Sequence, residues 1–242
     1  MVIPRNLESI HAEDERLRKA SVKMISGSSA LKDHISAIHA SMGLIFAIDQ
    51  GHEHRSADEK TIQYLGLRIF NSCASVLKLG LSGYYQSAFA LVRDVFETVL
   101  LIDYFRSEPS KIAVWESSNR KQRMKEFGPA SLRKALDKRD GFTEGRRKVM
   151  YDQLSEYASH ATAPGFRLVA PEGLGNIGPF LSEKYLKALI EELVKYAVHA
   201  GIIFSGFFDN VSNELILEKL AFVEHINGWR HTYFGASGQD AT

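Results

Sequence analysis

Residues 87–105, SAFALVRDVFETVLLIDYF, are the segment that most restricts how this chain can fold. The segment is apolar on nearly every helical face, and a helix of that kind is normally buried by other elements. It nevertheless contains Arg93, Asp94 and Glu97. Because charges inside a protein are costly unless they are paired, these side chains need partners. The sequence therefore predicts a central buried helix that carries either a polar network or a functional site.

Apolar residues recur at helical intervals of three and four along almost the whole chain. We expect helices over about 6–25, 30–49, 59–80, 84–106, 109–126, 130–138, 143–160, 182–207 and 210–229. Asp58, Thr143 and Ser182 are the expected first residues of three of these helices. The fold class is therefore all-α, with a single bundle-like helical domain over residues 1–234 and a disordered tail at 235–242.

Residues 161–181, ATAPGFRLVAPEGLGNIGPFL, interrupt the helical pattern with three prolines and four glycines. Gly173 to Gly178 spell G-x-G-x-x-G, but a dinucleotide site also needs a strand before this run and a helix after it. The apolar residues of the segment argue against a free linker, because disordered segments contain few of them. We expect an ordered loop that packs over the end of the 143–160 helix and partly covers His160, as a plug or as a lid.

Composition limits the class of protein but selects no partner. The 242 residues are 45% apolar and 24% charged, and the formal net charge is +1. The single cysteine, Cys73, excludes an intrachain disulfide and is expected in the core. No charge-free apolar run approaches the roughly 20 residues of a membrane span, and the first residues lack the apolar core of a secretory signal. We therefore expect a cytoplasmic protein without membrane contact.

Four polar residues are candidates for a site. Arg93 and Glu97 are four residues apart and can pair, and a planar guanidinium can also hold a carboxylate or phosphate through two hydrogen bonds. Tyr157 and His160 lie near the end of the 143–160 helix, where a histidine could exchange protons near neutral pH. Structural roles are the alternative, with Arg93 joining helices and His160 balancing a helix terminus. The scattered histidines predict neither a metal nor a cofactor.

A block of basic residues occupies 118–148. It holds eleven Lys and Arg against four Asp and Glu, a local net charge of +7, so the rest of the chain carries −6. Blocks of this kind usually form solvated faces, but they can also follow phosphates along a nucleic acid. RNA is therefore a candidate partner through residues 118–148, beside a homo-oligomer or a protein partner.

The runs GYYQSAFALVRDVFETVLLIDYF and YDQLSEYASHA resemble a group of all-helical bacterial proteins of unknown function. Those proteins share an Arg-x-x-x-Glu helix and a Tyr-x-x-Leu-Ser-x-x-x-His segment. The matching positions in this chain are Arg93, Glu97, Tyr151, Leu154, Ser155 and His160. Four residues separate Ser155 from His160 here, one more than in the family pattern.

This group is similar in outline to the helical nuclease superfamily of the HEPN type, which occurs in toxin and phage-defence systems. Ribonucleases of that superfamily use an Arg-x(4–6)-His motif, whose spacing is matched here by Arg5 and His11. The resemblance implies a regulatory or interaction domain as the leading function, with a defence or toxin system as one setting for it. A metal-independent endoribonuclease, with His160 as acid and base and Arg93 stabilising phosphate charge, is the first alternative. A helical sensor of an anionic small molecule is the second.

Overall fold

The computed structural model describes residues 5–235, and every regular element in that range is helical, which confirms the all-α fold class. The α-helices are α1 (Arg5–Ser26), α2 (Ser29–Gly51), α3 (Ala57–Leu81), α4 (Tyr85–Ser107), α5 (Lys111–Ser117), α6 (Arg120–Phe127), α7 (Pro129–Asp140), α8 (Arg146–Leu154), α9 (Glu183–Ser205) and α10 (Asn213–Phe234). A π-helix, η1 (Ser155–Ser159), directly follows α8, and two 3₁₀ turns, η2 (Pro164–Leu168) and η3 (Pro171–Gly173), lie before α9. The predicted tail, apart from Gly235, lies outside the described residues.

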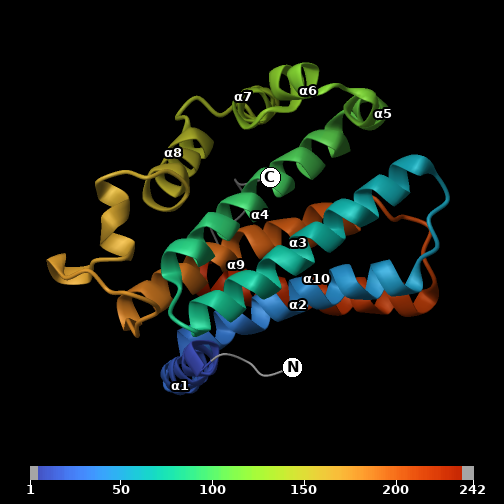
Figure 1. Cartoon of the computed structure of the whole chain (residues 1–242). Coiled ribbons are helices and arrows are strands. Elements are labelled where there is room, and N and C mark those ends of the chain that lie inside the picture. Colours follow the sequence, from blue (N-terminus) through green and yellow to red (C-terminus); the bar gives the residue numbers. More distant parts are fainter. Residues whose placement is uncertain (1–4, 236–242) are drawn as a thin grey trace.

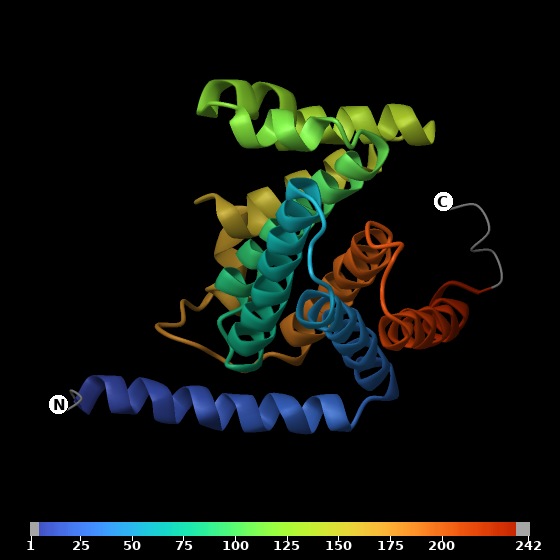
Figure 2. The ribbon, with the colours of Figure 1, turned by 90° about the vertical axis from the view of Figure 1, so that its right-hand side faces the viewer.

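The long helices α2, α3, α4, α9 and α10 run lengthwise beside one another (Figure 1). Helix α4 packs against α3 and α9, and α2 packs against α9 and α10. Figure 2 shows α1 crossing one end of this bundle, while α5, α6 and α7 cross the opposite end. Helices α7 and α8 both pack on α4, which positions the basic block beside the central helix.

Helix α4 is largely buried, as its apolar sequence predicts. Val92, Val95, Val99, Ile102 and Phe105 are fully inaccessible to solvent. They belong to one cluster of buried apolar side chains that draws on α2, α3, α4, α9 and α10. Because burial of each such side chain contributes about 1.5–3 kcal/mol, these residues of α4 strongly stabilise the packing of the long helices.

Several ends of helices differ from the prediction because short polar side chains bond to nearby backbone. The expected 109–126 helix is divided into α5 and α6, where Ser118 donates to the Val114 carbonyl and Asn119 accepts from the Gln122 amide. Ser56, not Asp58, caps α3. Thr143 does not cap α8, which instead begins after Gly145 in a left-handed conformation, φ 62°. Ser182 caps α9 as predicted.

None of the described helices is both long enough and apolar enough to cross a lipid bilayer. Cys73 is buried in the core as expected, and burial raises the pKa of its thiol to about 12. This side chain is therefore a small packing element that stays protonated at neutral pH.

Glycines allow two of the closest helix contacts. A Cβ added at Gly66 on α3 would lie 2.3 Å from Phe204 on α9, and one added at Gly201 would lie 2.6 Å from Phe222 on α10. The aromatic rings thus lie directly on glycine backbone, and a methyl group has no room at either position.

We predict that Gly66→Ala lowers the free energy of unfolding by about 1–3 kcal/mol, because the methyl group overpacks the core. Gly43→Ala is the matched control, since it also lies in a helix but a Cβ there meets nothing within 4 Å. That control should raise stability by about 0.5–1 kcal/mol. Urea unfolding measures both variants, and equal effects would contradict the close packing of α3 on α9.

Candidate functional site

Arg93 joins α4 to α8. Its Nε donates to Glu97 Oε1 at 2.8 Å, and its Nη2 donates to the Tyr151 hydroxyl at 2.7 Å. Its Cζ also lies 4.8 Å from the centre of the Tyr151 ring. The prediction that Arg93 and Glu97 contact each other or residues of 151–160 is therefore confirmed.

A second guanidinium flanks the same tyrosine. Arg133 of α7 lies with its Cζ 4.0 Å from the Tyr151 ring centre, and the residue is only 8% exposed. Its Nη1 has no hydrogen-bond partner in the described part of the chain. Two cations thus share one aromatic ring, and Glu97 is the carboxylate bonded to Arg93. The Tyr151 ring of α8 therefore contacts cations from both α4 and α7.

The other two candidate residues lie apart from this network. Tyr157 and His160 are both exposed, and no described contact links His160 to Arg93 or Glu97. Tyr157 lies within the π-helix η1, where the His160 amide donates to the Ser155 carbonyl five residues earlier. His160 follows this helix with an extended backbone, φ −110° and ψ 148°. The catalytic role of the four residues stays a prediction.

The 161–181 loop is ordered and packs where the sequence predicts. Thr162 donates to the Glu156 carbonyl at 2.5 Å, Leu168 is buried, and the Phe180 amide donates to the Gly83 carbonyl. The loop therefore covers the end of α8 and η1. His160 is exposed, and partial cover of this histidine by the loop stays a prediction. Phe180 packs against Tyr85 of α4 and Tyr185 of α9, whereas Phe166, Leu174 and Ile177 are exposed.

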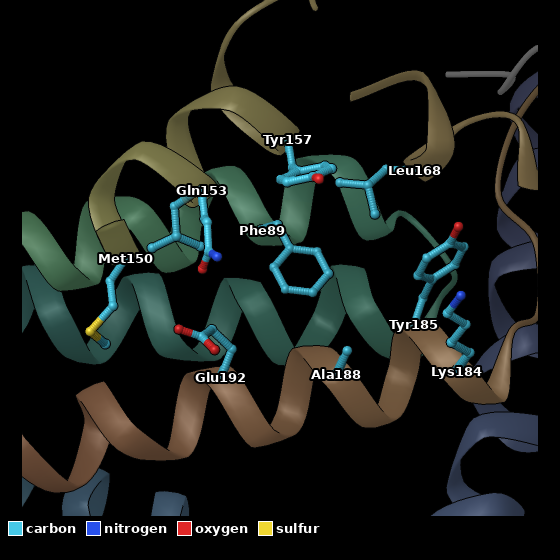
Figure 3. A pocket seen from close by; sticks show the side chains of 10 residues that line it. Phe89, Met150, Gln153, Tyr157, Leu168, Lys184, Tyr185, Ala188 and Glu192 are labelled. Carbon is cyan, nitrogen blue, oxygen red and sulfur yellow. The ribbon is translucent and has the colours of Figure 1, made fainter. Parts of the chain in front are cut away.

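Tyr157 instead lines a half-open cavity of about 270 Å³ between α4, α8 and α9 (Figure 3). Phe89 and Tyr185 form further aromatic walls. Met150 of α8 lines this cavity and also a second, larger one further along α9. The two cavities are therefore neighbours.

The second cavity has a volume of about 880 Å³ and lies between α4, α7, α8, α9 and α10. Five cationic side chains line it, against two carboxylates, Asp103 and Asp140. The cationic residues are Arg106, Arg139, Arg147, Lys195 and Arg230. Aromatic and aliphatic side chains form the remaining wall. The cavity thus combines an apolar surface with a charged one.

Ion pairs hold the charged wall of this cavity in place. Arg139 binds Asp103 through two hydrogen bonds, Nη1–Oδ1 at 2.8 Å and Nη2–Oδ2 at 3.2 Å. The same guanidinium donates through Nε to Asp140 Oδ1 at 2.6 Å. Arg147 donates to Asp140 and, at 2.7 Å, to Asp137. The paired guanidinium groups lower the pKa of the Asp140 carboxyl, although burial opposes that shift. This network joins α4, α7 and α8.

His199 of α9 faces the network, with Nε2 3.9 Å from Asp103 Oδ2. Loss of hydration lowers its pKa, and the negative charge of Asp103 opposes that shift, while Arg147 and Arg139 reinforce it. The side chain is 41% exposed, but it lines the cavity, where the surrounding protein still limits hydration. His199 is therefore neutral at pH 7 and able to gain a proton.

Sequence reasoning missed this second cavity. Asp103 was visible as a charge in an apolar helix, and His199 stands in the similarly apolar run YAVHAGIIF. A rule that paired isolated polar residues from different buried helices would have nominated both.

Among the described residues, no group of three or more His, Cys, Asp or Glu side chains could hold a metal ion.

Several cationic side chains of the basic block make contacts within the protein. Arg123, Arg133, Arg139, Arg146, Arg147 and Lys148 each contact a carboxylate, a carbonyl or an aromatic ring. Five others are exposed on α6 and α7 without an ion pair in the described chain: Arg120, Lys121, Lys125, Lys134 and Lys138. The outward charge is therefore concentrated on two helices.

No family model, curated protein or solved structure matches this chain. The likeness to the bacterial helical group consequently rests on its motif residues. The structure brings three of them, Arg93, Glu97 and Tyr151, into direct contact. Ser155, one helical turn after Tyr151, is buried, and its Oγ has no partner among the described residues.

We predict that Arg93→Ala lowers the free energy of unfolding by about 1–3 kcal/mol, because it removes two charge-assisted hydrogen bonds and one contact with the Tyr151 ring. The lower part of this range reflects the 32% exposure of the Glu97 side chain, which water partly stabilises. Tyr151→Phe, which keeps the ring and loses only the hydroxyl, should cost about 0.5–1.5 kcal/mol. Chemical unfolding gives both values, and an unchanged stability in Arg93→Ala would remove its structural role.

Proposed function

We propose that this protein is a regulatory domain that binds a small anionic organic molecule in the larger cavity. The supporting observation is that cationic side chains converge on a cavity of about 880 Å³ that also has an apolar wall. Natural ligand sites commonly measure 300–1,000 Å³ and combine apolar walls with a few polar groups. The cavity lies between helices that pair through ion bridges, so a ligand would stabilise their arrangement.

The charge of the lining favours an anion. Five cationic side chains line the cavity, against two carboxylates in the lining, Asp103 and Asp140. No carboxylate of the described chain forms an ion pair with Arg106, whose exposed guanidinium lines the cavity. Since a guanidinium holds carboxylates and phosphates through two parallel bonds, Arg106 is the expected anchor.

The apolar wall of the cavity indicates the chemistry of the rest of the ligand. Phe96, Leu100, Tyr196 and Trp229 also line the cavity. A bare inorganic anion would leave this surface exposed to water, which is unfavourable. The ligand class is therefore an organic acid or phosphate ester with an apolar or aromatic body.

A regulatory domain also needs a surface that passes its state to a partner. Four apolar residues of α10 are exposed on adjoining turns: Ile216, Leu217, Leu220 and Val223. Contiguous apolar residues on a surface commonly mark protein contacts. This surface supports a homo-oligomer or a protein partner, and α10 also lines the cavity through Trp229. A role in a defence or toxin system is proposed from the motif resemblance alone.

We predict that adenosine monophosphate or decanoate raises the melting temperature more than inorganic phosphate does, because only the first two fill the apolar wall. Arg106→Gln should weaken that binding about tenfold, whereas Arg120→Gln, an equal charge change on the outer face of α6, should leave it unchanged. Calorimetric titration gives the affinities. Equal effects of the two variants, or no shift with any of the probes, would contradict the proposal.

The same calorimetric titration, repeated at several pH values, tests whether His199 gains a proton when the ligand binds. A bound anion raises the pKa of a nearby imidazole, so binding takes up a proton and the affinity increases as the pH falls from 8 towards 5.5. His199→Gln should reduce this dependence on pH, since the amide has no charge to gain. Of the groups that face His199, Arg139 has a raised pKa and Asp140 a lowered pKa because the two are paired, so neither changes charge over this range.

RNA is the second candidate ligand, and the five exposed cations on α6 and α7 support it. These two consecutive helices lie at one end of the molecule (Figure 2), so a phosphate backbone could follow them. As a metal-independent ribonuclease, the protein would use the exposed His160 as acid and base. Arg93 would then have to exchange Glu97 or Tyr151 for a phosphate.

We predict that single-stranded RNA binds at 50 mM salt and that the triple variant Lys121→Glu, Lys125→Glu and Lys134→Glu weakens binding at least tenfold. The matched control reverses three exposed lysines elsewhere, Lys23, Lys32 and Lys78. Fluorescence anisotropy measures binding, and RNA integrity in EDTA measures cleavage, which His160→Ala should abolish. If the RNA stays intact, the ribonuclease hypothesis is wrong. If the two triple variants weaken binding equally, the α6–α7 surface is not the RNA-binding site.

A further inference from the structure

The smaller cavity is built from five separate elements of the chain. Phe89 comes from α4, Met150 and Leu154 from α8, Tyr157 from η1, Leu168 from η2, and Tyr185 from α9. Figure 3 shows the Phe89 ring between the α8–η1 side and the α9 side of the cavity, with Tyr157 and Tyr185 on opposite sides. Aromatic rings therefore form three of its walls, an arrangement that suits a flat apolar group.

The size of the cavity limits the ligand to a small molecule. A protein cavity of about 150 Å³ can hold one benzene molecule. The volume here is about 270 Å³, enough for one ring with a short substituent. A nucleotide or a long acyl chain would extend well beyond these walls.

The polar groups of the cavity favour a negative substituent. Glu192 already accepts hydrogen bonds from Lys195 and Tyr196, each at 2.5 Å, so its charge is neutralised. Lys184 is exposed beside the cavity, and its Nζ lies 6.0 Å from the centre of the Tyr185 ring. No carboxylate of the described chain forms an ion pair with Lys184. The ammonium of Lys184 is thus the charge that remains for a ligand.

Local hydrogen bonds keep the 161–181 loop beside this cavity. Tyr185, a wall residue, donates its hydroxyl to the Arg167 carbonyl at 2.7 Å, next to the buried Leu168. Gln86 of α4 donates to the Ala158 carbonyl at 2.5 Å, which fixes η1 and therefore Tyr157. Leu174 and Ile177, further along the loop, are fully or largely exposed. The part of the loop that touches the cavity is thus anchored by a hydrogen bond to α9, and η1 before it by one to α4.

We infer that the smaller cavity is a second binding site, which takes a small aromatic monocarboxylate. The ring lies among Phe89, Tyr157 and Tyr185, and the carboxylate pairs with Lys184. The bound ring also contacts Leu168 of the loop, and this contact stabilises the loop. This site is independent of the proposed function, because it uses Lys184 rather than Arg106, although Met150 lies between the two cavities.

Calorimetry and saturation-transfer NMR with phenylacetate test the site, and 2-phenylethanol serves as the uncharged probe of similar shape. We expect phenylacetate to bind more tightly than the alcohol. Lys184→Gln should weaken phenylacetate at least fivefold and leave the alcohol unchanged. Lys187→Gln is the matched control on the same helix, since Lys187 is exposed and does not line the cavity.

Ala188→Trp fills the cavity and should abolish binding of both probes while the circular dichroism spectrum stays that of the native protein. Hydrogen exchange of residues 161–170 should slow when phenylacetate binds. Failure of phenylacetate to bind, or unchanged binding in Ala188→Trp, would overturn the inference. Loss of phenylacetate binding in Arg106→Gln but not in Lys184→Gln would also overturn it, because that result would locate the probe in the larger cavity.

Discussion

Burial of α4 on all sides is the constraint on which the rest of the structure depends. A helix without a solvated face must be enclosed, and here α3, α9, α7 and α8 enclose it together. Its charged residues then have to find partners on those helices. Arg93 reaches Tyr151 on α8, Asp94 reaches Ser72 and Arg68 on α3, and Asp103 reaches Arg139 on α7. Arg93, Asp94 and Asp103 therefore each fix the position of one neighbouring helix, and both cavities border α4.

The sequence predicts the parts of this arrangement that arise from local spacing. Apolar periodicity locates the long helices, and a four-residue interval pairs Arg93 with Glu97. The sequence does not predict contacts between distant segments, because spacing along the chain contains no information on which helices become neighbours. His199 and Asp103 are 96 positions apart and meet only through the packing of α9 on α4. The π-helix is equally hidden, since SEYAS has no residue that excludes an ordinary α-helix.

The basic block shows how composition can mislead about function. Its net charge of +7 suggests one continuous cationic surface, yet Arg139 and Arg147 turn inwards to bind Asp103, Asp137 and Asp140. Arg133 turns inwards as well, onto an aromatic ring. The block therefore divides into a structural part, which attaches α7 and α8 to α4, and an outward part on α6 and the exposed face of α7. Substitutions in the first part disturb the fold, and only those in the second part report on a polyanionic partner.

The π-helix η1 has a consequence for how this chain can absorb a change of length. A turn closed between residues i and i+5 holds one residue more than an α-helical turn. Four residues separate Ser155 from His160, whose backbone groups close this turn. The π-turn is a place where a single inserted residue can be absorbed without displacing α8 or the loop that follows. Chain length at this one turn, rather than the choice of side chain, then decides which side of the helix presents the histidine.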